Sequence, residues 1–385
     1  MYYIDFKGDA LSALGLGTMR LPVLDGKEGA IDEREATRLI DAAFEHGITY
    51  FDTAWGYHAG TSEEVVGAAL ARHDRSTFFL ATKFPGYNTA NFGHHAEIFE
   101  QQLRKCRVEY FDYYLAHNVN EGNIERYLDE QRYHTMDYLL KQQAAGRIRH
   151  LGFSVHGRSE TFDRFLERYG QHMEFCQVQL NYFDWSFQDA AYKVGRCREL
   201  GIPVWVMEPL RGGKLCTLGP EQQALFEREA PGRSPREWAF RWLQSLEGLG
   251  VVLSGMSSVA QLEENAALFE TREPLSADEM EAAGAVARSM VDSIGVPCTS
   301  CRYCTSACPM GLDIPLLLSL YNEQCSHDTG RSFIPGMYLK SLPEDKRASA
   351  CLGCHACEQL CPQNIGIPDV LASLADMFER DGKDA

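Results

Sequence analysis

The stretch Thr49-Tyr-Phe-Asp52, which is followed from Thr61-Ser-Glu-Glu64 by a run with helical periodicity, is one copy of the pattern that decides the fold. A short apolar segment of this kind is typical of a buried strand, and the amphipathic run after it is typical of a helix. The alternation recurs through the first 270 residues. We therefore predict a series of strand–helix units in this part of the chain.

The first 270 residues hold eight such units. The predicted strands are 13–17, 49–52, 78–83, 113–117, 150–154, 175–180, 203–208 and 251–255. The predicted helices are 33–46, 62–72, 94–107, 131–145, 160–169, 188–200, 235–247 and 259–270. Eight units in about 270 residues predict an α/β fold, a (β/α)8 TIM barrel. The alternative is a doubly wound open sheet in which two elements are assigned wrongly.

Four helix starts carry a hydroxyl residue three positions before Glu or Gln, which is the spacing of a capping box. The pairs are Thr61 and Glu64, Ser234 and Glu237, Ser258 and Gln261, and Ser276 and Glu279. Pro235 stands at a first helical position, where its missing N–H costs nothing. The last pair predicts a further helix that runs to about residue 292 and links the barrel to the C-terminal part of the chain.

Eight of the thirteen cysteines lie in two runs near the C-terminus. The runs are Cys298-x2-Cys301-x2-Cys304-x3-Cys308-Pro and Cys351-x2-Cys354-x2-Cys357-x3-Cys361-Pro. The other five are scattered, and we expect them to be packing residues. Because the residues after each run also match, the runs form an internal repeat.

This spacing is the ligand pattern of bacterial ferredoxins, and it predicts two [4Fe–4S] clusters. The first three thiolates of a run hold one cluster, while the cysteine before proline ligates the other. The predicted sets are Cys298, Cys301, Cys304 and Cys361 for one cluster, and Cys351, Cys354, Cys357 and Cys308 for the other. The alternatives are a pair of zinc sites, which usually pair one CxxC with a second CxxC, and a disulfide framework.

The 42 residues between the runs exceed the usual gap of small ferredoxins and contain helix-like segments at 315–322 and 340–350. The region is therefore similar to the α-helical ferredoxins of multi-subunit redox enzymes. We predict three parts: a barrel over 1–272, a linker helix over 273–295, and a ferredoxin-like domain over 296–385. We expect the last to have little core of its own, so that the clusters could also stabilise it.

Four polar residues follow or end successive predicted strands. Asp52 and Tyr57 lie in Phe51-Asp-Thr-Ala-Trp-Gly-Tyr57, Lys83 ends the third strand, and His117 ends the fourth. Strand ends are where a barrel carries its chemistry. On these residues, roughly 10–270 of the chain resembles the aldo-keto reductase family. The resemblance implies a catalytic tetrad of Asp52, Tyr57, Lys83 and His117.

The physical chemistry of carbonyl reduction fits these roles. The reaction needs a hydride at carbon and a proton at oxygen, and an unperturbed tyrosine has a pKa near 10. A neighbouring Lys83 ammonium should lower the pKa of Tyr57, and Asp52 should hold Lys83 in place. His117 should orient the carbonyl by a hydrogen bond.

The resemblance also implies contacts to a nicotinamide cofactor, NADP(H) or NAD(H). The residues implied are Gly17, Thr18, Asp52, Ser154, Gln177, Met207, Leu210, Gly212, Gly255, Ser257, Gln261, Glu264 and Asn265. Three positions depart from the family pattern. Val155 replaces a common Asn, Met207 replaces a common aromatic residue, and Gly255 replaces a Lys that pairs with the 2′-phosphate. These departures weaken the case for NADP(H) over NAD(H) and leave both open.

The net charge of the chain limits the kinds of partner that it can bind. The formal net charge of −17 argues against binding to nucleic acid or to anionic membranes. We see neither a membrane-spanning run nor a signal peptide, and we expect a cytoplasmic protein. The leading hypothesis is an oxidoreductase that acts on a small-molecule carbonyl or alcohol, with a possible redox partner protein. The alternative is an electron-transfer or scaffold subunit whose barrel no longer catalyses.

Overall fold

The structure, a computed structural model, describes residues 1–27, 29–293, 295–298, 302–327, 330–361, 363 and 365–380. The chain forms two compact units, Met1–Gly284 and Ala285–Ala385. The division falls inside one helix, α12 (Ala277–Ser293). No helix in the described part of the chain has the length and apolar character needed to span a membrane.

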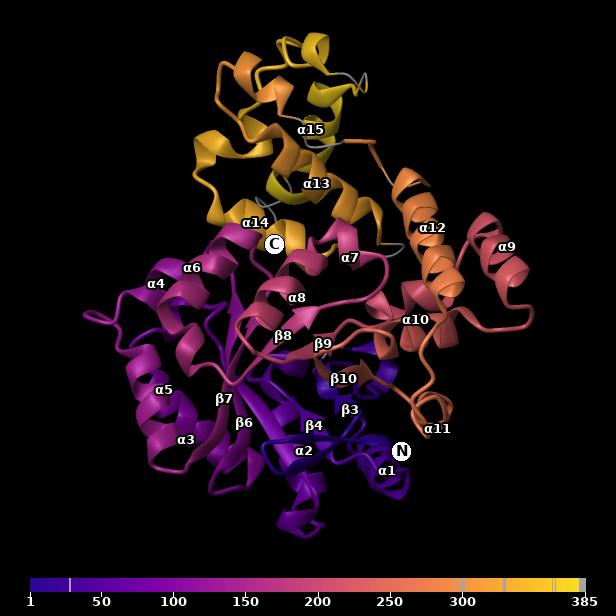
Figure 1. The fold of residues 1–385 in the computed structure, drawn as a ribbon. Helices are drawn as coiled ribbons and strands as arrows, with labels where there is room; N and C mark the ends of the chain where they lie inside the picture. The colour runs from indigo at the N-terminus through magenta and orange to yellow at the C-terminus, as the bar shows by residue number, and fades with distance from the viewer. Residues whose placement is uncertain are drawn as a thin grey trace. The chain divides into compact units, whose positions relative to one another are not determined.

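The first unit contains a closed barrel of eight parallel strands (Figure 1). The strands are β3 (Leu14–Gly17), β4 (Tyr50–Asp52), β5 (Phe79–Phe84), β6 (Phe111–Val119), β7 (Ile148–Val155), β8 (Phe175–Gln179), β9 (Val204–Met207) and β10 (Leu249–Gly255). Each strand pairs with the next in the sequence, and β10 pairs with β3 to close the ring. All eight predicted strands are present, each within two residues of the expected bounds.

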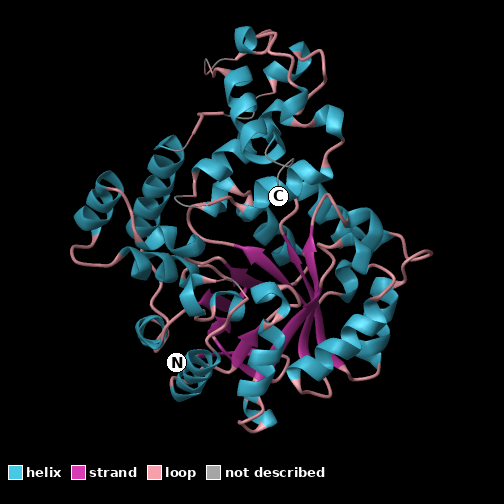
Figure 2. Cartoon of the chain, turned by 180° about the vertical axis from the view of Figure 1, so that it is seen from behind, coloured by secondary structure: helices cyan, strands magenta, loops and turns pink. Residues whose placement is uncertain are grey.

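Helices surround the strands (Figure 2). They are α1 (Glu33–Glu45), α2 (Ser62–Leu70), α3 (His95–Cys106), α4 (Ile124–Leu128), α5 (Thr135–Ala144), α6 (Ser159–Tyr169), α7 (Asp184–Phe187), α8 (Ala190–Glu199), α9 (Pro220–Glu229), α10 (Pro235–Gln244) and α11 (Val259–Ala267). The predicted start at 131 was wrong, because α5 begins at Thr135 and α4 is a separate short helix. The sequence pattern did not predict α9, which lies between the predicted strand 203–208 and the predicted helix 235–247.

Three of the four predicted caps are present. Glu237, Gln261 and Glu279 each donate a backbone N–H to the serine hydroxyl three positions earlier. The prediction for Thr61 was wrong. The Thr61 hydroxyl donates instead to the carbonyl of His58 at 2.8 Å, and Thr61 itself has a near-helical backbone rather than the extended one of a cap.

The barrel interior is filled by aromatic and aliphatic side chains. The cluster comprises Phe6, Leu11, Tyr50, Ala81, Tyr113, Leu115, Phe175, Trp205, Val251 and Leu253. Phe6 and Leu11 come from an antiparallel hairpin, β1 (Tyr3–Phe6) and β2 (Asp9–Ser12), which the sequence analysis did not predict. Because Phe6 packs edge-on against Trp205, with ring centroids 5.0 Å apart, the hairpin completes the apolar filling of the barrel.

Charged groups hold this hairpin to the barrel strands. The His150 ring lies between two carboxylates, 3.2 Å from Asp9 and 2.8 Å from Glu174. The Tyr113 hydroxyl donates to Asp9 at 2.9 Å, and Lys7 pairs with Glu174. The hairpin is thus attached by polar contacts as well as by Phe6.

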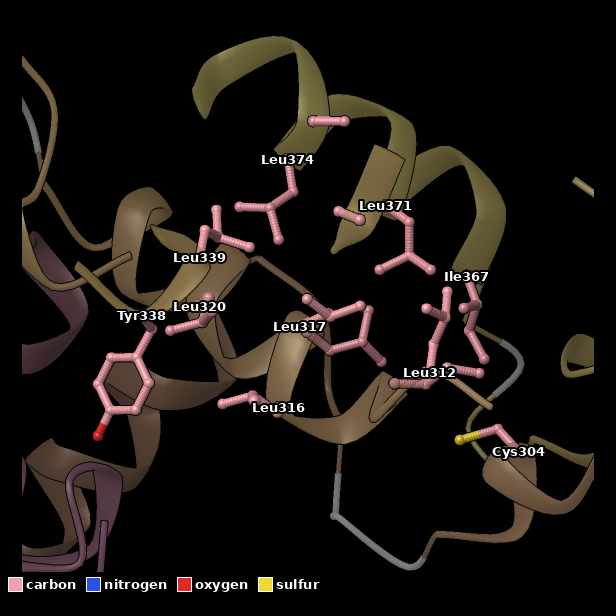
Figure 3. Close-up of a cluster of buried hydrophobic side chains, with 14 of the residues drawn as sticks. Cys304, Leu312, Leu316, Leu317, Leu320, Tyr338, Leu339, Ile367, Leu371 and Leu374 are labelled. Atoms are coloured by element: carbon pink, nitrogen blue, oxygen red, sulfur yellow. The ribbon is translucent and has the colours of Figure 1, made fainter. Parts of the chain in front are cut away.

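The second unit has a hydrophobic core of its own. Its helices are α13 (Ile314–Cys325), α14 (Phe333–Ser341) and α15 (Ile367–Ala375). Figure 3 shows Leu317 of α13 and Leu371 and Leu374 of α15 meeting in this core, and all three are buried. The expectation that this domain has little hydrophobic core of its own was therefore wrong. The helix expected over 340–350 was also wrong, because α14 ends at Ser341 and two short 3-10 turns come after it.

Candidate functional site

The four tetrad residues predicted from the sequence meet at the carboxyl ends of the barrel strands. Asp52 is the last residue of β4, Lys83 the last but one of β5, and His117 the third from the end of β6. Tyr57 begins the short turn Tyr57–Gly60 that follows β4. Because neighbouring parallel strands end at the same edge, these residues share one site.

The Lys83 ammonium is the centre of the group. Its Nζ donates to Asp52 Oδ1 at 2.6 Å, to the carbonyl of Thr53 at 2.7 Å and to the Tyr57 hydroxyl at 3.4 Å. The side chains of Lys83 and Asp52 are 0% and 3% exposed. A charge so deeply buried requires a paired partner, and Asp52 supplies it.

Burial controls the protonation of the site. Burial raises the pKa of Tyr57 above the ordinary phenol value, and the Lys83 ammonium opposes only part of that rise. The expectation that Lys83 would bring the pKa of Tyr57 below its usual value was therefore wrong for the site without ligands. Burial pulls the pKa of Lys83 down, but Asp52 and Tyr57 outweigh it, and the pKa stays raised. Tyr57 is thus a neutral phenol beside an ammonium.

His117 is a neutral imidazole. Burial, with the positive charge of Lys83 nearby, lowers the pKa of His117 well below its usual range. The ring lies edge-on to the Tyr57 ring, with centroids 6.3 Å apart. Its Nδ1 is buried and has no hydrogen-bond partner in the described part of the chain. A neutral ring with free hydrogen-bonding capacity can bind an uncharged oxygen.

The turn that carries Tyr57 has an unusual backbone. The three residues after Tyr57 all have positive φ, namely His58 at 52°, Ala59 at 54° and Gly60 at 94°. Non-glycine residues adopt this conformation only at a cost in energy. Lys105 of α3 holds the turn, because its Nζ donates to the Gly60 carbonyl at 3.1 Å and lies 4.3 Å from the centre of the Trp55 ring. The sequence analysis gave Lys105 no role.

A buried carboxylate links Lys105 to the strand that carries Lys83. Glu63 lies 3.7 Å from Lys105 Nζ and accepts hydrogen bonds from Thr82 and Gln102, each at 2.7 Å. The Gln102 amide also donates to the carbonyl of Lys83 at 3.0 Å. The network therefore connects the Tyr57 turn to the Lys83 backbone from the outer side of the barrel.

Two of the predicted nicotinamide contacts are neighbours. Ser154 of β7 and Gln177 of β8 are paired residues on adjacent strands, so their side chains face the same side of the sheet. The Ser154 hydroxyl accepts from the backbone N–H of Asn118 at 2.8 Å. Gln177 Oε1 is buried and has no hydrogen-bond partner in the described residues. An acceptor left free in this way fits an amide group of a bound cofactor.

The other predicted cofactor residues line the same end of the barrel. Gly255, Gly17 and Asp52 end three consecutive strands in matching register. The Thr18 hydroxyl donates to the carbonyl of Asp52 at 2.9 Å. Met207 ends β9, whereas Leu210 and Gly212 lie in the turn after it.

Around α11, Gln261 accepts from the backbone N–H of Ser257 at 2.8 Å, and Glu264 pairs with Arg236. Asn265 donates to Ser254 at 3.3 Å, while its Oδ1 is buried without a hydrogen-bond partner in the described residues. Asn265 thus has the same free acceptor as Gln177.

Arg20 is a cation at this end of the barrel that the sequence analysis missed. Its side chain passes over Gly255, where an added Cβ would lie 3.2 Å from Arg20 Cγ and Cδ. Its Nη2 lies 4.0 Å from Glu208 and close to Gly212. The Ser257 hydroxyl donates to the Arg20 carbonyl at 2.7 Å. A positive charge therefore lies beside the position where the family pattern has Lys.

In the second unit, four cysteines line one cavity. They are Cys308, Cys351, Cys354 and Cys357, the same four that the sequence analysis assigned to one cluster. The backbone N–H of Leu312 lies 3.5 Å from Cys308 Sγ, as a donor to a thiolate would. Four thiols around a cavity lined largely by apolar residues fit an iron–sulfur cluster.

The structure describes three of the four cysteines that were predicted to hold the other cluster. Cys298, Cys304 and Cys361 all contact the core of the second unit, and Cys304 is buried. Cys301 lies outside the described residues. Every cysteine in the described part of the chain is free rather than disulfide-bonded.

Comparison with known proteins identifies both units. Residues 13–288 match the model of the aldo/keto reductase family, and residues 297–365 match a 4Fe-4S dicluster domain. A curated relative, the L-galactose dehydrogenase of Arabidopsis thaliana, is 26% identical over 293 residues, which cover 71% of this chain and 88% of the relative. A probable aldo-keto reductase of Glycine max is 30% identical over 216 residues, covering 54% and 58% of the two chains.

Solved structures agree with the fold. The holo form of an aldo-keto reductase from Bacillus halodurans superposes with a TM-score of 0.60 at 26% identity, covering 72% of this chain and 93% of that one. An aldo-keto reductase from Klebsiella pneumoniae in complex with NADPH has a TM-score of 0.59 at 22% identity, with 74% and 95% covered. The chain therefore belongs to the aldo/keto reductase family and carries a 4Fe-4S ferredoxin domain after its barrel.

Proposed function

We propose that the protein reduces a small-molecule carbonyl compound with NADPH or NADH, or oxidises the corresponding alcohol, and that its C-terminal domain holds two [4Fe–4S] clusters. In this proposal residues 1–272 are the catalytic barrel, 273–295 a linker helix and 296–385 the cluster domain. One observation carries the catalytic part: a single buried ammonium, Lys83 Nζ, contacts both Asp52 and the hydroxyl of a neutral Tyr57.

The roles of the residues follow from their protonation. Bound nicotinamide supplies the hydride that reaches the carbonyl carbon. Tyr57 gives its proton to the carbonyl oxygen, and the Lys83 ammonium stabilises the phenolate that remains. His117 donates a hydrogen bond that orients the carbonyl, and Asp52 keeps Lys83 in position. The alcohol product carries the hydride and the proton, and Tyr57 recovers its proton from solvent.

Three buried or basic groups would hold the cofactor. The free acceptors of Gln177 and Asn265 can each take an amide or amino N–H of the dinucleotide. Arg20 can offer positive charge to a cofactor phosphate in the place of the lysine that Gly255 replaces. Because a cation is present without that lysine, either nicotinamide cofactor can be accommodated.

We assign electron transfer to the cluster domain. A [4Fe–4S] cluster supplies one-electron transfer when bound. Because α13, α14 and α15 already form a hydrophobic core, this domain does not depend on clusters alone for its packing. Cys354 is exposed, so one cluster would lie near the surface, within reach of a redox partner protein. Clustered cysteines that hold metal rather than forming disulfides are typical of a reducing compartment, and we place the protein in the cytoplasm.

The first experiment is a direct test of the proposal. The anaerobically purified protein, with its iron and sulfide confirmed, is given NADPH or NADH and a panel of carbonyl compounds. We expect cofactor consumption that depends on both protein and carbonyl. No consumption with any carbonyl, and no reduction of NADP+ or NAD+ by the matching alcohols, would contradict the catalytic part.

The same sample tests the role of the clusters. We expect NADPH or NADH to bleach the visible absorbance of the clusters. Oxidation of one nicotinamide to NADP+ or NAD+ yields two electrons and a proton, and each of the two clusters accepts one electron. If dithionite bleaches the clusters and neither NADPH nor NADH does so, the proposal that electrons pass from the barrel to the clusters is wrong. The clusters would then serve structure or another electron donor.

Lys105 should affect the reaction through the Tyr57 turn. Replacing Lys105 with Met keeps an aliphatic chain against Trp55 but removes the hydrogen bond to Gly60 and the charge beside Glu63. We expect kcat to fall on the order of tenfold, because small displacements of a reacting group reduce rates strongly. Lys105→Arg, which can still donate to Gly60, should recover most of the activity. Equal kcat in Lys105→Met and the wild type would contradict this role.

A further inference from the structure

A hollow between α2 and α3, on the outside of the barrel, is lined by polar side chains. It has a volume of about 440 Å³, and its walls come from the first turn of α2 and the C-terminal end of α3: Glu64, Gln101, Arg104, Lys105 and Arg107. A site for an organic molecule is usually lined by apolar and aromatic groups, which are missing from this set. Because three of the five side chains are cations and one is a carboxylate, the hollow favours an anion.

The guanidinium groups of Arg104 and Arg107 are available to a ligand. Both residues are exposed, and neither side chain has a hydrogen bond or an ion pair with the described residues. Glu100, one turn before Arg104 on α3, is bound instead by Arg147 through two hydrogen bonds of 2.7 and 2.9 Å. A guanidinium group binds phosphate oxygens through paired N–H donors. Two of them beside one hollow therefore suit a phosphate-type anion.

Part of this positive charge also has a structural role. Arg104 and Lys105 lie in the last turn of α3, where cations offset the helix dipole. That role requires only charge near the end of the helix. It does not account for a hollow that three cations line, or for two guanidinium groups that have no carboxylate partner.

Lys105 connects the hollow to the reaction site. It lines the hollow, while its Nζ donates to the Gly60 carbonyl at 3.1 Å and lies 3.7 Å from the buried Glu63. The Lys105 side chain is 20% exposed, so an anion in the hollow can approach it. A charged acceptor binds an ammonium more strongly than a neutral carbonyl does, and the four-carbon stem of lysine is flexible. A bound anion can thus compete with Gly60 for Lys105.

We propose that this hollow binds a phosphate-type anion, free or as the phosphate group of a small metabolite, and that the bound anion slows the reaction by drawing Lys105 away from Gly60. The effect on the rate rests on the proposed function, whereas the binding does not. Without Lys105 on Gly60, the turn that carries Tyr57 is held less firmly and the proton donor is placed less well. Because the anion does not occupy the place of the cofactor or the carbonyl, kcat falls while KM changes little.

Isothermal titration calorimetry tests the binding on the protein with its clusters intact, in chloride buffer of constant ionic strength. We expect one site for inorganic phosphate and for glycerol phosphate, and the tighter of the two shows whether the free anion or a phosphate ester is preferred. Arg104→Gln/Arg107→Gln should weaken this binding at least about tenfold, because both guanidinium groups are lost. Arg34→Gln/Arg38→Gln removes two exposed arginines of α1 and is the matched control, which should bind as the wild type does.

Steady-state rates test the connection to the Tyr57 turn. At saturating nicotinamide and carbonyl, the anion should lower kcat of the wild type and of the α1 control severalfold, toward the value expected for Lys105→Met. Arg104→Gln/Arg107→Gln should keep the wild-type kcat in chloride and should not respond to the anion. Inhibition that excess nicotinamide relieves would place the anion in the cofactor site and overturn the inference.

The outcomes separate this inference from the proposed function. If the wild type binds neither phosphate compound, or if Arg104→Gln/Arg107→Gln binds them equally well, the hollow is not an anion site and the inference fails. Binding without any change in kcat overturns the role of Lys105. If no form of the protein reduces a carbonyl, the proposed function fails, and calorimetry still decides whether the hollow binds the anion. An unchanged cluster absorbance and thermal midpoint show that the variants are folded.

Discussion

Replacing Tyr57 with Phe is expected to abolish carbonyl reduction while leaving nicotinamide binding and the cluster absorbance intact. The substitution removes one oxygen atom, the only proton donor that lies beside Lys83 in the described site. General acid catalysis contributes about 10²- to 10⁴-fold to such reactions, and we expect kcat to fall by that amount. The ring itself remains to pack against His117.

Steady-state rates with NADPH and NADH measure the loss, and a fluorescence titration measures cofactor binding in the same variant. Tyr192→Phe is the matched control, because the Tyr192 hydroxyl bonds to Asp163 on the outer helices. Its rates should equal those of the wild type. A Tyr57→Phe variant with more than about a tenth of the wild-type kcat would exclude Tyr57 as the main proton donor.

The protonation of Tyr57 also predicts how the rate depends on pH. Burial raises the pKa of Tyr57, so the phenol keeps its proton up to and beyond the ordinary value of about 10. Reduction, which needs the phenol, should therefore show a constant kcat from about pH 6 to 9 and decline only at higher pH. Oxidation of an alcohol needs the phenolate and should become faster as the pH rises. A decline of reductive kcat near pH 7 would contradict the assignment.

The repeated strand–helix pattern was enough to predict the barrel, because parallel strands buried on both faces are continuous apolar runs with little ambiguity. The sequence pattern did not predict the β1–β2 hairpin, and the reason is physical. It is held by contacts between residues far apart in the sequence, such as Phe6 with Trp205 and Asp9 with His150, and no local pattern records them. The cap at Thr61 failed because the turn before α2 places the His58 carbonyl within reach of that hydroxyl, three residues earlier in the chain.

In the candidate site, too, the sequence predicts some features and not others. Asp52, Tyr57, Lys83 and His117 could be predicted, since a residue at a strand end has its place set by the topology. The pKa of Tyr57 could not, because burial is a property of the packed site and exceeds the effect of Lys83. Lys105 and Arg20 could not be found either, since each reaches the site from an element whose local sequence carries no motif.

Replacing either Cys308 or Cys354 with Ala is expected to remove one of the two clusters from the second unit. Each single alanine variant should retain about half of the wild-type iron and sulfide, because four thiolates hold each cluster. Cys325→Ala, which removes an exposed cysteine outside both runs, is the control and should keep all of the iron. Iron and sulfide analysis of the anaerobically purified variants, with the electron paramagnetic resonance of the reduced proteins, provides the measurement.

The double variant Cys308→Ala/Cys354→Ala decides how the two runs share their clusters. In the structure Cys308, from the first run, lines the same cavity as Cys351, Cys354 and Cys357. Both substitutions then damage one cluster, and the double variant should lose no more iron than either single variant. If each run instead held its own cluster, Cys308 and Cys354 would belong to different clusters, and the double variant would lose both. A double variant without iron would therefore refute the crossed arrangement, whereas a double variant with half of the iron requires that the fourth cysteine of the first run crosses to the cluster of the second.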